Sequence, residues 1–333
     1  MHKRLYARCD LTFTITARSP LLVQGAQAAE GAATFYRARD PTDGREKYCI
    51  PATTLKGVWR SAAEAILRSF GEWLACDPLE EDKENTGKAS KSCSARLQDS
   101  SVFNSPLAYA ATCPACRLFG SLVHAGLLEV HDAWAVGKPQ PLSQTGIAID
   151  RFSGGVKQGE VKDGKARGGA LYSYQALPEG TMFESRLALR NFELWQIGLL
   201  ALVFREMGAD RVRLGSGTRK GLGHVAIEVT GADFRYPATR YEQVAEGRPG
   251  QICSALALAM PEERIVGVPD DPWLMSGLSP VPAESWADIG WKRFRVVAPE
   301  LHELLRGCVE KALAPRLRAG RRGFFPVAHD GGA

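Results

Sequence analysis

The sequence predicts an α+β fold of the ferredoxin-like type, with elements in the order strand, helix, strand, strand, helix, strand. Residues 8–17 alternate between apolar and polar side chains, as expected of a half-buried strand. Two segments, 55–70 and 192–207, have the apolar residues of helices that pack against a core. Further strand-like segments lie at 126–134, 183–190 and 225–229. This is the split βαβ pattern, in which both helices cover one face of a four-stranded antiparallel sheet and the other face stays free.

The first helix has clear boundaries. We expect Thr53 or Thr54 to be its N-cap and Gly71 to end it. Lys56 and Arg60 belong to a charged stripe at i, i+4 spacing. This stripe is either a nucleic-acid contact or an ordinary exposed helix face.

The second helix is apolar on most sides and should be buried. We expect Asn191 to cap it and Gly208 to end it. Between the first strand and the first helix, residues 25–44 are rich in glycine, alanine and charge and are expected to form a long loop.

The predicted core spans residues 1–230 and carries two long insertions. One, at 72–125, contains cysteines, and the other, at 135–180, is basic. Residues 231–333 form a C-terminal extension of unassigned role, with a helix expected at 299–313.

Composition bounds the class of protein. The 333 residues are 45% hydrophobic and 24% charged, which excludes a disordered, collagen-like or coiled-coil chain. The longest apolar stretch, 197–204, is far shorter than the ~18 residues of a membrane span. No apolar signal core follows the first basic residues, so we expect a cytoplasmic protein.

The net charge is only +5, but positive charge gathers in segments 151–170, 211–220 and 311–322. This distribution favours local binding of a polyanion over a generally basic surface. Solubilising surface charge is an equally good explanation from charge alone.

The cysteines suggest a metal site. Cys113 and Cys116 form a Cys-x-x-Cys motif, and Cys76 and Cys93 precede it. Four thiolates would complete a tetrahedral structural Zn²⁺ site, with His124 as an alternative fourth ligand. Free structural thiols and a redox role for the Cys-x-x-Cys motif remain alternatives.

A glycine-rich segment, 214–223, also carries an arginine and a lysine. Glycines permit close approach of the backbone to phosphates. A Walker or dinucleotide loop runs from strand to helix, whereas this one runs from helix to strand, so a nucleotide-binding enzyme is disfavoured. The remaining alternatives are a loop that contacts a polyanion and a flexible turn.

The basic insertion carries aromatic residues as well. Phe152, Tyr172 and Tyr174 offer rings that could stack on nucleobases. The alternative is a solvated hairpin whose aromatic residues are buried at its base.

Five motifs, in the same order along residues 8–230, resemble those of the CRISPR-associated RAMP superfamily. They lie at 50–61, 113–120, 149–155, 177–183 and 214–223. Each is weak alone, but together they are specific. The closest subgroup resembles the repeated backbone subunit of type III, type III-D-like or type III-derived effector complexes.

This resemblance implies an RRM-like palm and copies of the chain stacked along a guide RNA (crRNA), which pairs with a target RNA. It implies other effector subunits, including a separate nuclease, and a thumb hairpin within the basic insertion. It also implies that Cys76, Cys93, Cys113 and Cys116 hold zinc. The implied RNA-binding residues are Thr53, Thr54, Lys56, Arg60, Arg117, Arg151, Phe152, Lys157, Arg167, Gly215, Gly217, Thr218, Arg219 and Lys220.

One departure from the family pattern concerns cleavage. Members that cut their target have an aspartate shortly after the first strand, but residues 19–30 contain none. We therefore expect a subunit that binds RNA without cutting it, since a missing general base or ligand strongly reduces cleavage. The rival prediction is an endoribonuclease for target or precursor crRNA that uses Glu30, Asp40 or Asp43.

Overall fold

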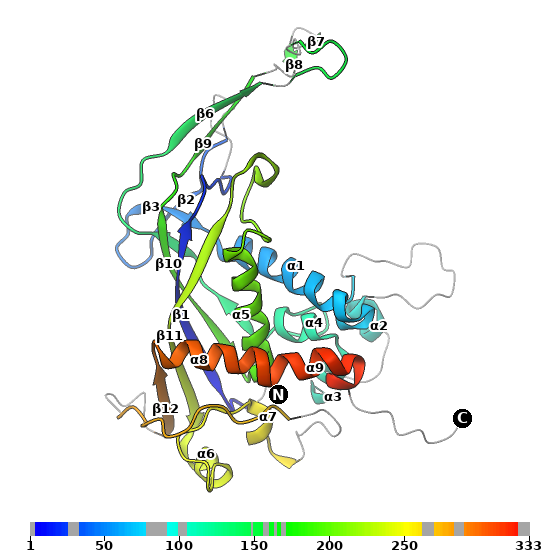
Figure 1. Ribbon diagram of the computed structural model, residues 1–333, viewed down its shortest axis with the longest axis vertical. Helices are drawn as coiled ribbons and strands as arrows, with labels where there is room; N and C mark the ends of the chain where they lie inside the picture. The colour runs from blue at the N-terminus through cyan, green and yellow to red at the C-terminus, as the bar shows by residue number, and fades with distance from the viewer. Residues whose placement is uncertain are drawn as a thin grey trace, which may run out of the picture.

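The computed structural model describes residues 4–25, 33–77, 92–98, 105–147, 149–155, 160–162, 165–167, 171–261, 270–282 and 290–325. Within these residues, an antiparallel sheet has the strand order β12-β11-β1-β10-β5-β3-β2, and β4 pairs with β10 beside β5. Figure 1 shows the helices gathered on one side of this sheet.

The centre of the sheet confirms the predicted fold class. β1 (Arg8–Ala17) pairs with β10 (Met182–Arg190) on one side and with β11 (Val225–Pro237) on the other. β4 (Leu128–Val130) and β5 (Ala133–Ala135) both pair with β10. The predicted second strand is therefore two short strands. When β4 and β5 are counted as one strand, the four core strands lie in the order β11, β1, β10, β4/β5, which is the ferredoxin-like order 4-1-3-2.

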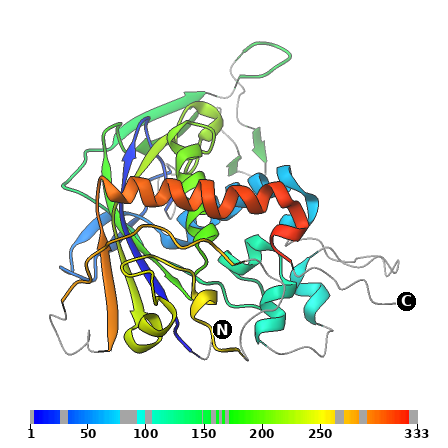
Figure 2. The same cartoon turned by 60° about the horizontal axis from the view of Figure 1, so that its bottom comes forward.

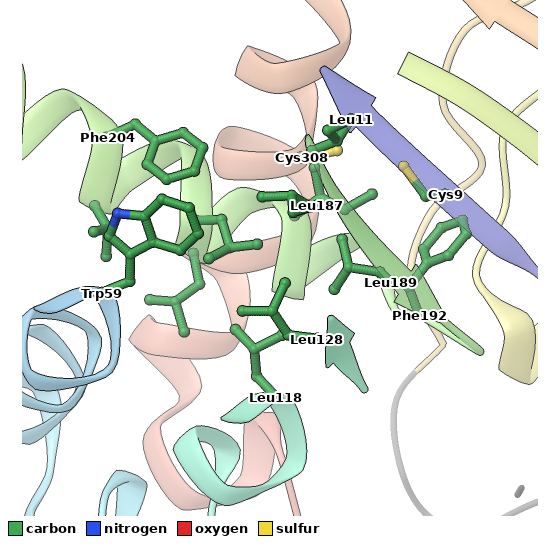
Figure 3. Close-up of a cluster of buried hydrophobic side chains, with 14 of the residues drawn as sticks. Cys9, Leu11, Trp59, Leu118, Leu128, Leu187, Leu189, Phe192, Phe204 and Cys308 are labelled. Carbon is green, nitrogen blue, oxygen red and sulfur yellow. The ribbon is translucent and has the colours of Figure 1, made fainter. Parts of the chain in front are cut away.

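Two helices pack on the same face of this sheet because their apolar sides meet over β1. Trp59 of α1 (Ala52–Phe70) lies edge-on to Phe13 of β1, with ring centroids 5.7 Å apart. It also lies edge-on to Phe204 of α5 (Leu194–Gly208), at 5.0 Å. Figure 3 shows Trp59 and Phe204 in this buried cluster.

The predicted cap of α1 is wrong. Thr53 and Thr54 lie inside the first turn, and Pro51 precedes the helix without a side-chain cap. The carboxylate of Asp132, in the break between β4 and β5, accepts a hydrogen bond from the Ala52 amide at 2.7 Å. A residue distant in sequence therefore satisfies a free amide at the helix start. Gly71 follows the helix, as predicted.

The predicted cap of α5 is also wrong. Asn191 has a left-handed backbone (φ 50°), and its side-chain oxygen accepts from the amides of Tyr6 and Ala7. Glu193 precedes the helix instead, and its amide donates to the Gln196 side chain at 3.0 Å. Asn191 thus joins the start of β1 to the end of β10.

The predicted loop at 25–44 is wrong in part, because β2 (Arg37–Arg39) lies within it and pairs with β3 (Glu46–Ile50). A three-residue strand with charged ends has too little alternation to be recognised in the sequence.

The C-terminal extension joins the same sheet and the same helical layer. β11 continues past residue 230 and pairs with β12 (Trp291–Val296). After β12, α8 (Glu300–Gly307), a π-helical segment (Cys308–Leu313) and α9 (Ala314–Ala319) follow one another. Figures 1 and 2 show this helical run crossing α5. Two short helices precede β12, α6 (Ala238–Val244) and α7 (Ala255–Leu258).

The two insertions add short helices and strands, and α4 of the cysteine-containing insertion packs into the main core. The cysteine-containing insertion includes the 3₁₀ turn η1 (Glu72–Leu74), α2 (Cys93–Gln98), α3 (Ser105–Ala111) and α4 (Pro114–Phe119). The basic insertion forms a two-stranded ribbon of β6 (Leu142–Ile147) and β9 (Leu171–Ala176), and further along β7 (Glu160–Lys162) pairs with β8 (Lys165–Arg167). The ribbon projects away from the sheet (Figure 1). Among the described residues, no helix has the length and apolar character required to cross a membrane.

We predict that Gly198→Ala destabilises the protein. A Cβ at Gly198 would lie 2.5 Å from the carbonyl oxygen of Cys308, so α5 and the π-helical segment would have to separate. Overpacking of this kind costs about 1–3 kcal/mol, which exceeds the gain of about 1 kcal/mol from replacing a helical glycine. Urea unfolding measures the net loss.

Gly208→Ala is the matched control, because it lies at the end of the same helix and has nothing within 4 Å of its added Cβ. We expect its unfolding free energy to be unchanged or slightly raised. Equal stability of the two variants would contradict the close helix contact.

Candidate nucleic-acid surface and metal site

Four cysteine side chains come together beneath α1. The sulfur atoms of Cys76, Cys93, Cys113 and Cys116 all lie within 4.8 Å of one another, and none of these cysteines forms a disulfide. The pKa of the Cys93 thiol is well below its ordinary value because the Cys113 and Cys116 thiols hydrogen-bond to it. Four soft donors in this arrangement fit a tetrahedral metal ion with no open position. His124 is outside the cluster and lies edge-on to Tyr109, with ring centroids 5.4 Å apart.

Two arginines of the charged stripe on α1 donate hydrogen bonds to cysteines of this cluster. Arg60 donates to the Cys116 sulfur at 3.8 Å and to Glu64 at 2.8 Å. Arg68 donates to the carbonyl of Cys76 at 2.6 Å and to the other oxygen of Glu64 at 3.1 Å. Arg60 and Arg68 are therefore placed as an outer shell of the cysteine cluster, Arg60 at a sulfur and Arg68 at a backbone carbonyl.

Two other predicted RNA-binding cations are also engaged inside the molecule. The side chain of Arg117 is fully buried and donates to the carbonyls of Tyr109, Ala110 and Thr112 at the end of α3. The Lys56 ammonium donates to the Leu128 carbonyl at 2.9 Å, and burial lowers its pKa. These cations tie helices to their neighbours.

The glycine-rich segment 214–223 is a fixed loop. The Ser216 amide donates to the Leu22 carbonyl at 2.7 Å, and the Gly223 amide donates to the Pro20 carbonyl at 3.0 Å. Gly215 has φ 85°, and a Cβ there would lie 2.3 Å from the Leu22 oxygen. Gly217 is likewise left-handed (φ 74°) and precedes the 3₁₀ turn η2 (Thr218–Lys220). Gly215 is required because the loop packs directly on the segment after β1, and Gly217 is favoured because its backbone is left-handed.

This loop presents its cations to solvent. Arg219 is exposed and forms no ion pair with any described residue, and Thr218 is half-buried beside it. Lys220 is exposed too, and its Nζ lies 3.8 Å from the centre of the Tyr172 ring, near the start of β9. The structure thus brings the predicted glycine loop and the predicted aromatic segment together.

A turn that follows β6 carries a second set of exposed side chains. Asp150 accepts hydrogen bonds from the amides of Phe152 at 2.9 Å and Ser153 at 2.8 Å, which shapes a tight turn. Phe152 is fully exposed on this turn, with Arg151 beside it. Of the remaining predicted residues, Lys157 lies outside the described residues, Arg167 is described only as part of β8, and Thr53 and Thr54 are exposed and half-buried at the start of α1.

The acidic candidates are held in the turn between β2 and β3. Lys47 forms ion pairs with Asp40 at 2.7 Å and with Asp43 at 2.8 Å, and Asp40 also accepts from Thr42. The hydrogen bond from Lys47 and those from Thr42 lower the pKa of Asp40 to about 2. Such a carboxylate is a poor proton acceptor at neutral pH. Glu30 lies outside the described residues.

Sequence comparison now decides the family. Residues 14–226 match the family model of the RAMP superfamily. The chain belongs to the RAMP superfamily. Comparison with curated proteins yields no match. Among solved structures, a chain titled "Type IV-B CRISPR Complex" is similar, with a TM-score of 0.40 and 18% sequence identity, over 67% of this chain and 90% of that chain.

Two contacts that support α1 and the glycine loop could not be predicted from the sequence. Asp132 caps α1, and the segment around Leu22 supports the glycine loop. Neither carries a local signal, since both act through backbone groups of distant elements. The proximity of Tyr172 and Tyr174 could have been predicted from the sequence, because residues i and i+2 lie on one face of a strand.

We predict that Arg60→Ala weakens metal binding while leaving the four sulfur ligands in place. With Zn²⁺ as the probe, we expect an affinity loss of about 10-fold or more, the usual cost of removing an outer-shell partner. Competition with a chromophoric chelator measures it. Cys116→Ser should lose the metal altogether.

Lys56→Ala is the control, since Lys56 is on the same helix and donates to Leu128. It should bind the metal like the unaltered chain. If Arg60→Ala also binds Zn²⁺ with unaltered affinity, the outer-shell role of the stripe is wrong.

Proposed function

We propose that this RAMP protein is an RNA-binding backbone subunit of a CRISPR effector ribonucleoprotein of type III or type III-derived class. Several copies would assemble along a crRNA and support its pairing with a target RNA. Family membership and the five ordered motifs support this proposal. Sequence would be read by base pairing with the guide, so the protein needs contacts to backbone and to ring faces.

The observation that carries the proposal is the distribution of free and engaged cations. Lys56, Arg60 and Arg117 are engaged within the molecule, whereas Arg151 and Arg219 are exposed on the ribbon and the glycine loop. Exposed cations on two adjoining elements suit a phosphate backbone. We therefore assign RNA binding to the ribbon and the loop.

We propose that the metal is zinc and that it is structural. Cys76, Cys93, Cys113 and Cys116 would hold it. When bound, the ion cross-links segments of an insertion whose helices have only six or seven residues each. Metal binding then supplies stability that such short helices lack on their own.

We also propose that the chain does not cut its target and that a separate nuclease subunit of a cytoplasmic complex does so. The ion pairs of Asp40 and Asp43 with Lys47 support this proposal, because a carboxylate held in an ion pair is a poor proton acceptor. One observation favours the endoribonuclease alternative: Asp40 and Asp43 line a cleft of about 980 Å³ together with basic side chains that include Arg37, Arg45 and Lys138.

Replacing Arg151 and Arg219 together with alanine should weaken binding of single-stranded RNA at every sequence tested. We expect the slope of log K against log salt to fall by up to about 1.4, which is about 0.7 for each lost phosphate contact. Fluorescence anisotropy at several salt concentrations measures this change.

The matched control is the double variant Lys56→Ala with Arg60→Ala, supplied with excess Zn²⁺. It should retain the salt slope, since these half-buried side chains are engaged in hydrogen bonds within the protein. A slope that falls in the control, or that is unchanged in the Arg151 and Arg219 variant, would contradict the assignment.

Cleavage needs its own test. We expect end-labelled RNA complementary to the guide to stay intact when the chain, assembled with crRNA, is incubated with Mg²⁺ in the absence of other subunits. Regularly spaced products that disappear in Asp40→Ala or Asp43→Ala would instead establish an endoribonuclease.

A further inference from the structure

A small cavity lies where the ribbon meets the glycine loop. Its volume is about 210 Å³, and it is lined by Leu22, Ala33, Tyr172, Ser173, Tyr174, Ser216, Gly217, Lys220 and Leu222. Pockets for drug-sized ligands span ~300–1,000 Å³, so this cavity suits a single small group. The described residues that line it include one cation and no carboxylate.

Two aromatic rings form one wall of the cavity. Tyr172 and Tyr174 are nearly parallel, with an interplanar angle of 13° and centroids 6.4 Å apart. The Tyr174 hydroxyl donates to Gln144 across the ribbon at 2.5 Å, which fixes this ring. Tyr172 is 40% exposed, so part of its ring is open to a ligand.

The position of Tyr172 depends on the residue opposite it. Gly146 pairs with Tyr172 across the ribbon, and a Cβ at Gly146 would lie 2.1 Å from the ring. The ring therefore lies over the glycine, where a larger residue would displace it. In this position Tyr172 reaches Lys220 of the glycine loop.

We propose that this cavity stacks one unpaired nucleobase of bound single-stranded RNA on Tyr172, with Lys220 at the adjoining phosphate. The proposal rests on the proposed function and adds a base-binding site to it. A flat ring face accepts any base, which suits a protein that leaves sequence reading to the guide. Lys220 has no acidic partner among the described residues, and its Nζ lies over the Tyr172 ring. A stacked base would take the place of the ammonium on the ring, and the ammonium would move to the adjoining phosphate.

The test uses the purified full-length chain and a short single-stranded RNA in which 2-aminopurine replaces adenine. Stacking on tyrosine quenches 2-aminopurine fluorescence, and anisotropy of an end label reports affinity separately. We expect quenching with the unaltered chain and with Tyr172→Phe, which keeps the ring. Tyr172→Ala should lose the quenching and bind about 5- to 150-fold more weakly, the range for one base–aromatic stack.

Gly146→Ala tests the same geometry with every chemical group of the cavity retained. We expect it to reduce quenching as Tyr172→Ala does, because the added Cβ displaces the ring. Phe70→Ala removes an exposed ring at the far end of α1 and should change neither signal.

The outcomes separate the two proposals. RNA that binds every variant equally well, without quenching, overturns the base site and leaves RNA binding intact. Failure of the unaltered chain to bind RNA overturns both. Weaker binding of Tyr172→Ala to an RNA of the same length with abasic sites throughout would also overturn the base site, because a lost stack affects only RNA that has bases.

Discussion

Trp59 holds α1 against the sheet through its contacts with Phe13 and Phe204, and the position of α1 determines much of the surrounding structure. With one side of the helix buried by this ring, Lys56 is directed to β4 and Arg60 to the cysteine cluster. A helix that rolled on the sheet would release both contacts together. The cysteine cluster and the sheet are thus coupled through one buried aromatic residue.

A second buried group joins the C-terminal extension to α5. Arg316 forms ion pairs with Asp271 at 3.0 Å and with Glu193 at 3.4 Å, and Tyr109 donates to Glu193. Burial raises the pKa of Glu193. Removing one member of such a group leaves an uncompensated buried charge, which costs about 3–5 kcal/mol. Segments from four parts of the chain therefore fold interdependently around the start of α5.

Several charges on the open face of the sheet are paired with one another, whereas Arg186 and Arg295 on the same face are exposed and form no ion pair with a described residue. Arg8 pairs with Asp10, and both Arg235 and Arg293 pair with Asp233. Paired charges attract a polyanion weakly. The exposed cations of the described ribbon and glycine loop are consistent with the RNA-binding surface proposed above.

Local patterns in the sequence determined the main core elements, the fold class and the cysteine set, because alternation, helical spacing and a Cys-x-x-Cys motif are properties of neighbouring residues. β1 and both core helices were predicted in this way. Tertiary structure alone decided which cations are free: Arg117 and Arg219 look alike in sequence, yet one is buried and the other exposed. It also decided the helix caps, since Asp132 is 80 residues from the amide it accepts from and Asn191 is 185 residues from Tyr6. These partners meet only when the sheet forms, so no local signal specifies them.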